Sequence, residues 1–135
     1  MNTRDRIASY VKALRAGEDV SECLQDVGEA AAPALIAAFN EESDRQIRRE
    51  IVEIIWQYRS PANVPFLAGC LRDHDDEVRQ QAIDGLISLG IPEARKALTT
   101  ALERCRSGPQ VEQDFAEYLA EAIESMDKQP PVTGE

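Results

Sequence analysis

The most constraining feature of the sequence is that its chemistry repeats every 31 residues. Ile36, Leu67 and Leu98 occupy equivalent positions at this interval. The same step relates Ile47-Arg48 to Val78-Arg79, Asp44 to Asp75, Ile55 to Leu86, and Pro61 to Pro92. A fixed period of this length predicts one supersecondary unit stacked on copies of itself. Stacked repeats present an extended surface, so the period favours a binding function over a catalytic pocket.

The spacing of the apolar residues indicates helices throughout, and no segment alternates as a strand would. Eight helical segments are expected, at about 3–16, 20–27, 30–40, 44–58, 60–72, 75–89, 92–105 and 110–126. Taken in pairs, they predict an all-α fold, an α-solenoid of four stacked antiparallel helical hairpins. We expect residues 1–127 to form a single domain and residues 128–135 to be a flexible C-terminal tail.

The ends of these segments carry helix-terminating signals. Ser43 is expected to cap the fourth segment, and Gly17 and Gly90 are expected to end the first and the sixth. The last hairpin is two residues longer, because Val111 takes the place of Val78 at a step of 33 residues. Its second helix is expected to face inward through Val111, Phe115, Leu119 and Ile123.

The charge of the chain restricts its partners. The formal net charge is −10, which disfavours binding to nucleic acid and to anionic membranes. No apolar run approaches the roughly 20 residues of a membrane span, and no signal peptide is visible. The negative electrostatic potential of the chain would attract a protein with a basic patch, although negative charge can also serve solubility alone. Cys23, Cys70 and Cys105 share no motif, so reduced thiols and a cytoplasmic location are expected.

The segment LRDHDDEVR at residues 71–79, followed by Ala82, Leu86 and Gly90, resembles the HEAT repeat. The closest likeness is to the short-period HEAT class found in bilin lyases and many small bacterial proteins, and it covers about residues 28–105. The resemblance implies a superhelix whose second helices, here called helices B, line the concave side. It also implies a non-enzymatic scaffold that binds other proteins.

The resemblance also assigns a structural role to two arginines. Arg48 and Arg79 stand at the family's helix-B arginine position, where each would bond an acidic residue of the turn. The candidate acceptors are Asp44, Asp75, Asp73 and Glu42, and a ligand-binding role for the arginines is the alternative. Arg48 and Arg79 form a series, the arginine ladder, which ends at the last hairpin, where Glu112 stands in place of arginine.

The remaining residues offer little catalytic chemistry. The acidic turn at residues 73–77 lacks the glycine and glutamate that a calcium loop needs, so helix capping is the better interpretation. Cys70 lies one turn before His74, which could suggest a nucleophile pair, but its register predicts a buried thiol. With one histidine and scattered cysteines, no zinc site can be assembled. We therefore expect no catalytic residue, no metal and no cofactor.

The helix-B register predicts which side chains face a partner. Trp56 is predicted either to pack between repeats or to be a partly exposed anchor at an interface. The predicted binding residues are Arg45, Arg49, Glu53, Trp56, Gln80, Asp84, Asp114, Glu117, Glu121 and Glu124. The last four form an acidic stripe, which can be a binding face or simply a solvated one.

These observations lead to one main function and two alternatives. The main hypothesis is a monomeric, non-enzymatic scaffold or adaptor that binds a basic protein across its helix-B face. The first alternative is an acidic inhibitor of immunity or antitoxin type, which would cap the active site of a basic toxin or enzyme. The remote alternative is a bilin-lyase-like subunit, which would need a chromophore groove.

Overall fold

The computed structural model describes residues 3–18 and 29–128, and these residues form helices and no strands. Seven α-helices are present where eight were expected, because the predicted helix at 20–27 lies outside the described residues. Of the tail expected at 128–135, Lys128 is the last residue of α8, and residues 129–135 lie outside the described residues. The helices are α1 (Thr3–Arg15), α3 (Ala32–Glu41), α4 (Arg45–Gln57), α5 (Val64–Cys70), α6 (Asp76–Leu89), α7 (Pro92–Arg106) and α8 (Gln110–Lys128).

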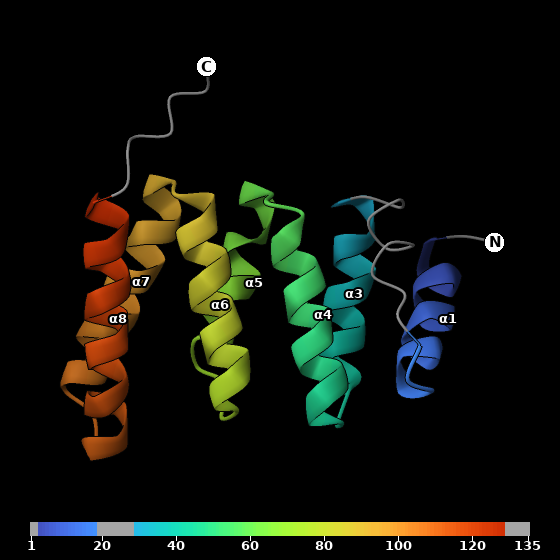
Figure 1. The fold of residues 1–135 in the computed structure, drawn as a ribbon, viewed down its shortest axis with the longest axis horizontal. Coiled ribbons are helices and arrows are strands. Elements are labelled where there is room, and N and C mark those ends of the chain that lie inside the picture. The colour runs from blue at the N-terminus through green and yellow to red at the C-terminus, as the bar shows by residue number, and fades with distance from the viewer. Residues whose placement is uncertain (1–2, 19–28, 129–135) are drawn as a thin grey trace.

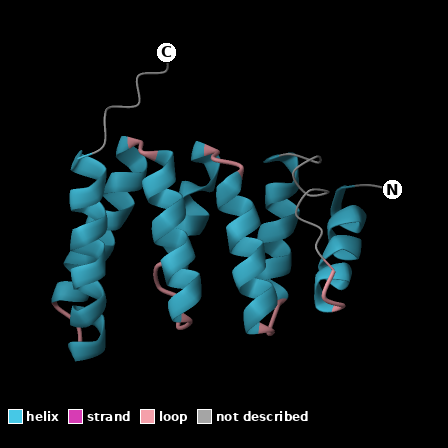
Figure 2. Cartoon of the chain, viewed as in Figure 1, coloured by secondary structure: helices cyan, strands magenta, loops and turns pink. Residues whose placement is uncertain are grey.

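The helices form two layers, as Figures 1 and 2 show. One layer, the helix-B layer, contains α4, α6 and α8, and the other contains α3, α5 and α7. Each helix contacts its hairpin partner, and neighbouring hairpins meet through α4 with α6, α5 with α7, and α6 with α8. Helix α1 packs against α3 and α4 at the N-terminal end. This arrangement confirms the all-α solenoid that the 31-residue period predicts.

The core lies between the two layers and follows the repeat register. Leu67 and Leu98, one period apart, are fully buried, as are Ile55 and Leu86. Burial of a side chain of this size contributes about 1.5–3 kcal/mol relative to full exposure. Buried residues of all these hairpins belong to one hydrophobic cluster, so the core is continuous along the stack.

Aspartates cap the first two helices of the helix-B layer, α4 and α6. Asp44 caps α4, where its Oδ1 accepts a hydrogen bond from the Ile47 amide at 3.0 Å. The prediction that Ser43 is this cap was therefore wrong, because the chain leaves its extended conformation one residue later. Asp75 caps α6 in the same way through the Glu77 amide. Gly90 ends α6 with a φ of 61°, which glycine adopts without steric cost.

The fifth predicted segment is divided into two parts. A 3₁₀ turn, η2 (Pro61–Asn63), precedes α5. Pro65 has no amide hydrogen, so it cannot donate to the turn before it, and this favours a break near the start of α5. Asn63 is buried, and its Nδ2 donates to the Ile55 carbonyl oxygen of α4 at 3.4 Å.

The last helix departs from the predicted inward face. Leu119 is fully buried and Phe115 and Ile123 are partly buried, but Val111 is 71% exposed. The prediction that Val111 faces inward was wrong. Its counterpart Val78 is buried because α6 has neighbours on both sides, whereas no described helix follows α8. The exposed first turn of α8 consequently borders a surface groove.

Candidate protein-binding surface

An ion pair joins the second complete hairpin to the first. Arg48 on α4 donates through Nη1 and Nη2 to Asp73 Oδ2, at 3.0 and 2.8 Å. The Arg48 guanidinium also lies over the Phe39 ring, 4.1 Å from its centroid. Asp73 Oδ1 in turn accepts from the Asp75 amide at 2.9 Å. The predicted bond to an acidic turn residue is present, and it reaches into the turn of the next hairpin.

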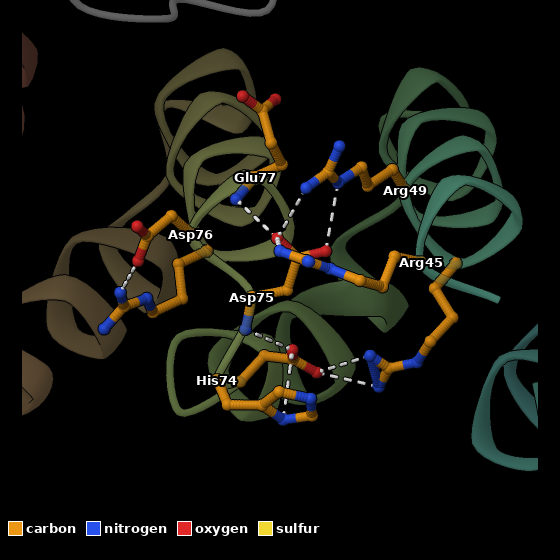
Figure 3. Close-up of polar contacts among 9 residues, drawn as sticks. Arg45, Arg49, His74, Asp75, Asp76 and Glu77 are labelled. Atoms are coloured by element: carbon orange, nitrogen blue, oxygen red, sulfur yellow. Dashed lines mark hydrogen bonds and ion pairs between the residues drawn. The ribbon is translucent and has the colours of Figure 1, made fainter. Parts of the chain in front are cut away.

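A second pair lies beside the first. Arg49 donates through Nε and Nη2 to the two oxygens of Asp75, each at 3.0 Å, and Arg45 lies 3.7 Å from the same carboxylate. Figure 3 shows Arg45 and Arg49 both directed at Asp75 from α4. The hydrogen bonds from Arg49 hold the pKa of Asp75 below its ordinary value, although burial opposes them. Both arginines, predicted to bind a partner, thus join neighbouring repeats.

Arg79 occupies the equivalent of Arg48 but has different partners. Its Nη2 bonds to Asp76 in the first turn of its own helix, and its guanidinium lies 4.5 Å from the centroid of the Phe115 ring. Its Nε is the one buried side-chain polar atom of the described residues that lacks a hydrogen-bond partner. The ladder prediction holds for Arg48 with Asp73, whereas Arg79 bonds neither Asp73 nor Asp75.

A groove of about 320 Å³ separates the first turns of α6 and α8. Three of its lining residues are apolar or aromatic, and two of these, Val111 and Tyr118, are the large apolar side chains that stand most exposed in the described structure. The lining residues are Asp76, Glu77, Arg79, Gln80, Val111, Asp114, Phe115 and Tyr118. The groove therefore combines apolar and aromatic side chains with the three carboxylates of Asp76, Glu77 and Asp114, here called its acidic rim.

The family model for HEAT repeats matches residues 32–120, which is more than half of the chain and spans α3 to the middle of α8. The chain belongs to the HEAT-repeat family. No curated protein matches the chain, and no solved structure matches it. HEAT repeats generally mediate binding between proteins and are typically non-enzymatic. The match does not extend to the bilin-lyase subclass.

The HEAT hairpins bring two of the predicted binding residues to the groove. Gln80 and Asp114 line it from opposite sides. Glu117 instead lines a hollow between α7 and α8, together with Arg106, Gln113 and Ala120. The acidic stripe on α8 therefore does not border a single hollow. Asp84, Glu53, Glu121 and Glu124 are exposed, and Glu124 pairs with Lys128 at 3.1 Å.

Trp56 lies between two repeats, as one of its two interpretations predicts. Its Nε1 donates to Gln81 Oε1 on α6 at 2.7 Å. A Cβ atom on Gly85 would lie 2.5 Å from the Trp56 Cβ, so the two helices approach closely here. The indole is partly buried and packs against the core. These contacts account for Trp56 without a partner.

Sequence reasoning missed Tyr118 and Val111 as groove residues. Their exposure depends on α8 being the last described helix, and the repeat register does not state where the stack ends. One signal was available, because α8 carries Tyr118 among acidic residues that were already singled out as a surface stripe.

Cys70 was predicted to be a buried thiol rather than a nucleophile, and its environment agrees with that prediction. Cys70 is buried, and burial raises the pKa of its thiol to about 12. The side chain of His74 is 90% exposed and lies 3.8 Å from Asp73 Oδ1. Within residues 3–18 and 29–128, no group of three or more metal-ligating side chains is found.

No helix in these two ranges is long and apolar enough to cross a bilayer.

Proposed function

We propose that this HEAT-repeat protein is a non-enzymatic adaptor that binds a basic partner protein through the groove between α6 and α8. The groove receives a lysine or arginine side chain of the partner. The rest of the helix-B layer, including Asp84, contributes a negative surface that orients the partner. The partner is therefore a protein with a basic patch.

The observation that carries this proposal is the exposed Tyr118 inside an acidic rim. Tyr118 is 60% exposed and lies among Asp76, Glu77 and Asp114. An aromatic face attracts a cation, and the aliphatic stem of lysine or arginine packs on apolar surface. The one arginine of the groove, Arg79, is bonded to Asp76, so it leaves the rim negative.

The test uses two charge-matched substitutions on α8. Asp114→Lys reverses a charge inside the groove, and Glu121→Lys makes the same reversal outside it. A pull-down with mass spectrometry identifies the partner, and titration calorimetry with that partner measures the affinity. We expect Asp114→Lys to weaken binding at least about tenfold, as the loss of one charge-assisted contact would. Tyr118→Ala should weaken it comparably, and Glu121→Lys should change it less than about threefold.

A second comparison separates the groove from the rest of the acidic stripe. The double substitution Glu117→Lys with Glu121→Lys alters the stripe and leaves the groove intact. Loss of binding in this variant, with retention in Asp114→Lys and Tyr118→Ala, would show that the outer stripe is the binding face. It would contradict the groove proposal.

The inhibitor alternative is a narrower form of the same interaction. An acidic groove with an exposed tyrosine can also cap a basic active site. If the captured partner is an enzyme whose activity is lost on binding, the adaptor becomes an inhibitor of immunity type. We place the protein in the cytoplasm, where the free, buried thiols of Cys70 and Cys105 would stay reduced, and we propose that it is a monomer.

A further inference from the structure

At the 31-residue step, the acidic turn residues of the HEAT repeats are followed by arginines in the last hairpin. The position of Asp73 is held by Glu42 one period earlier and by Arg104 one period later. Likewise, Arg106 stands one period after Asp75. Glu42 repeats the role of Asp73, because its Oε2 accepts from the Asp44 amide at 3.0 Å. Arg104 and Arg106 lie in the last turn of α7, and Arg79, the equivalent of Arg48, forms no ion pair with a described carboxylate of the last hairpin.

A hollow of about 300 Å³ is lined by both Arg79 and Arg104. Its lining residues are Leu71, Arg72, Arg79, Arg104, Cys105, Glu112 and Phe115. The unpartnered Nε of Arg79 belongs to the same set. Glu112 is the one acidic residue of the lining. Its carboxylate lies against Gly108, and none of the ion pairs found among the described residues includes it.

The hollow continues into a groove between α5 and α7, on the layer opposite to the helix-B layer. This groove has a volume of about 420 Å³ and shares Arg72 and Arg104 with the hollow. Its floor consists of the small residues Ala68, Gly69, Ala97, Thr100 and Ala101, with Lys96 and Glu93 at the rim. Arg72, Lys96 and Arg104 form no ion pair within the described part of the chain, so the groove is cationic on a chain of net charge −10.

We propose that the groove between α5 and α7 binds an acidic peptide segment of a second partner protein. One carboxylate of that segment enters the hollow, bonds to Arg79 and Arg104, and takes the place that Asp73 holds in the preceding repeat. The unpaired cations supply charge complementarity, and the small residues of the floor leave room for a peptide backbone. A long polyanion such as nucleic acid is disfavoured by the negative charge of the rest of the surface.

The hollow shares Arg79 and Phe115 with the groove between α6 and α8, whereas Arg72 and Arg104 line only the present site, so variants at Arg72 and Arg104 test it independently of the first proposal. The probe is a fluorescein-labelled octapeptide of alternating alanine and glutamate, and the matched probe carries glutamine in place of glutamate. Fluorescence anisotropy at low salt measures binding to the full chain. We expect saturable binding of the glutamate probe and at least about tenfold weaker binding of the glutamine probe, because charged hydrogen bonds are lost.

Two charge-matched variants locate the site. Arg104→Asp removes a cation from the hollow, and Arg106→Asp makes the same change two residues away, outside both cavities. We expect Arg104→Asp to weaken binding of the glutamate probe at least about tenfold and Arg106→Asp to weaken it less than about threefold. Arg72→Gln, on an exposed side chain, provides a second variant that preserves the fold and should also weaken binding.

Three results would overturn the proposal. The first is equal binding of the two probes, and the second is an equal loss in Arg104→Asp and Arg106→Asp, which would indicate general attraction. The third is unchanged binding in both Arg72→Gln and Arg104→Asp.

Discussion

Arg48 on α4 and Asp73 in the turn of the next hairpin are joined by two hydrogen bonds to a single carboxylate oxygen, at 2.8 and 3.0 Å. The two side chains are only 16% and 8% exposed. The bond therefore links neighbouring repeats across a boundary that the core alone would leave without directional contacts. The next boundary, between α6 and α8, lacks such a bond, because Arg79 pairs with Asp76 of its own helix.

Removal of Arg48 should destabilise the stack. Arg48→Ala leaves Asp73 buried without its cation, and we expect the free energy of unfolding to fall by about 3 kcal/mol. Urea unfolding monitored by circular dichroism measures the change. Arg45→Ala is the control, because Arg45 is 72% exposed and its ion pair should contribute little. Equal losses in the two variants would contradict this role of Arg48.

Gly85 should not tolerate a methyl group. In Gly85→Ala the new Cβ would lie 2.5 Å from the Trp56 Cβ, so α4 and α6 must move apart. We expect a loss of about 1–3 kcal/mol, the usual cost of overpacking, together with a change in tryptophan fluorescence. Gly69→Ala is the matched control, since nothing lies within 4 Å of its Cβ position. That variant should gain up to about 1 kcal/mol from helix propensity.

The charge of Asp75 should make stability depend on pH in acid. Because Arg49 lowers the pKa of Asp75 from its ordinary value of 3.8, the ionised form stabilises the folded chain. This contribution is complete above about pH 4 and is lost as the pH falls through the lowered pKa of the folded state. Asp75→Asn keeps a capping side chain but removes the charge. It should lower the thermal midpoint at pH 7.

The difference in midpoint between wild type and Asp75→Asn should shrink as the pH is lowered below about 4. Thermal melts from pH 7 to pH 2.5 measure it. The control is Asp44→Asn, because Asp44 caps α4 through a backbone amide and forms no ion pair with any described residue. A constant difference at all pH values would show that the pairing with Arg49 does not carry the effect.

Restoring a carboxylate at the last boundary should stabilise the protein. Arg104→Asp places an acceptor in the hollow that Arg79, the residue with the unpartnered Nε, helps to line, and it removes one cation from that lining. We expect a gain of about 1 kcal/mol in the free energy of unfolding. Urea unfolding of Arg104→Asp and Arg106→Asp, which have the same net charge, tests this. A gain of equal size in both would reflect net charge rather than the hollow.

The helices themselves could be predicted closely from sequence. The predicted segment at 92–105 compares with α7 at Pro92–Arg106, and the predicted segment at 75–89 compares with α6 at Asp76–Leu89. The agreement has a local cause, because proline, glycine and capping aspartates act within one turn of their own positions. The position of the α4 cap was wrong by one residue, since Ser43 and Asp44 both satisfy the same rule.

The candidate site was less predictable. Arg45 and Arg49 were expected to face a partner, yet both are directed at Asp75 in the next hairpin. A helical register gives the direction of a side chain relative to its own helix, but not the length of its reach toward a neighbour. Asp114 and Gln80, predicted on the helix-B face, line one groove, whereas the register could not reveal that Glu117 borders a different hollow.

The sequence by itself determined the repeating unit, its period of 31 residues, the helices and most of their buried positions. These follow from apolar periodicity and from capping, which act over a few residues. Only the tertiary structure decided which arginines are paired and where apolar surface stays exposed. Arg48 pairs with a carboxylate across the repeat boundary, Arg79 pairs with Asp76 of its own helix, and Val111 and Tyr118 are exposed on α8. Those outcomes depend on which side chains neighbouring hairpins bring together, and on which helix lies at the end of the stack.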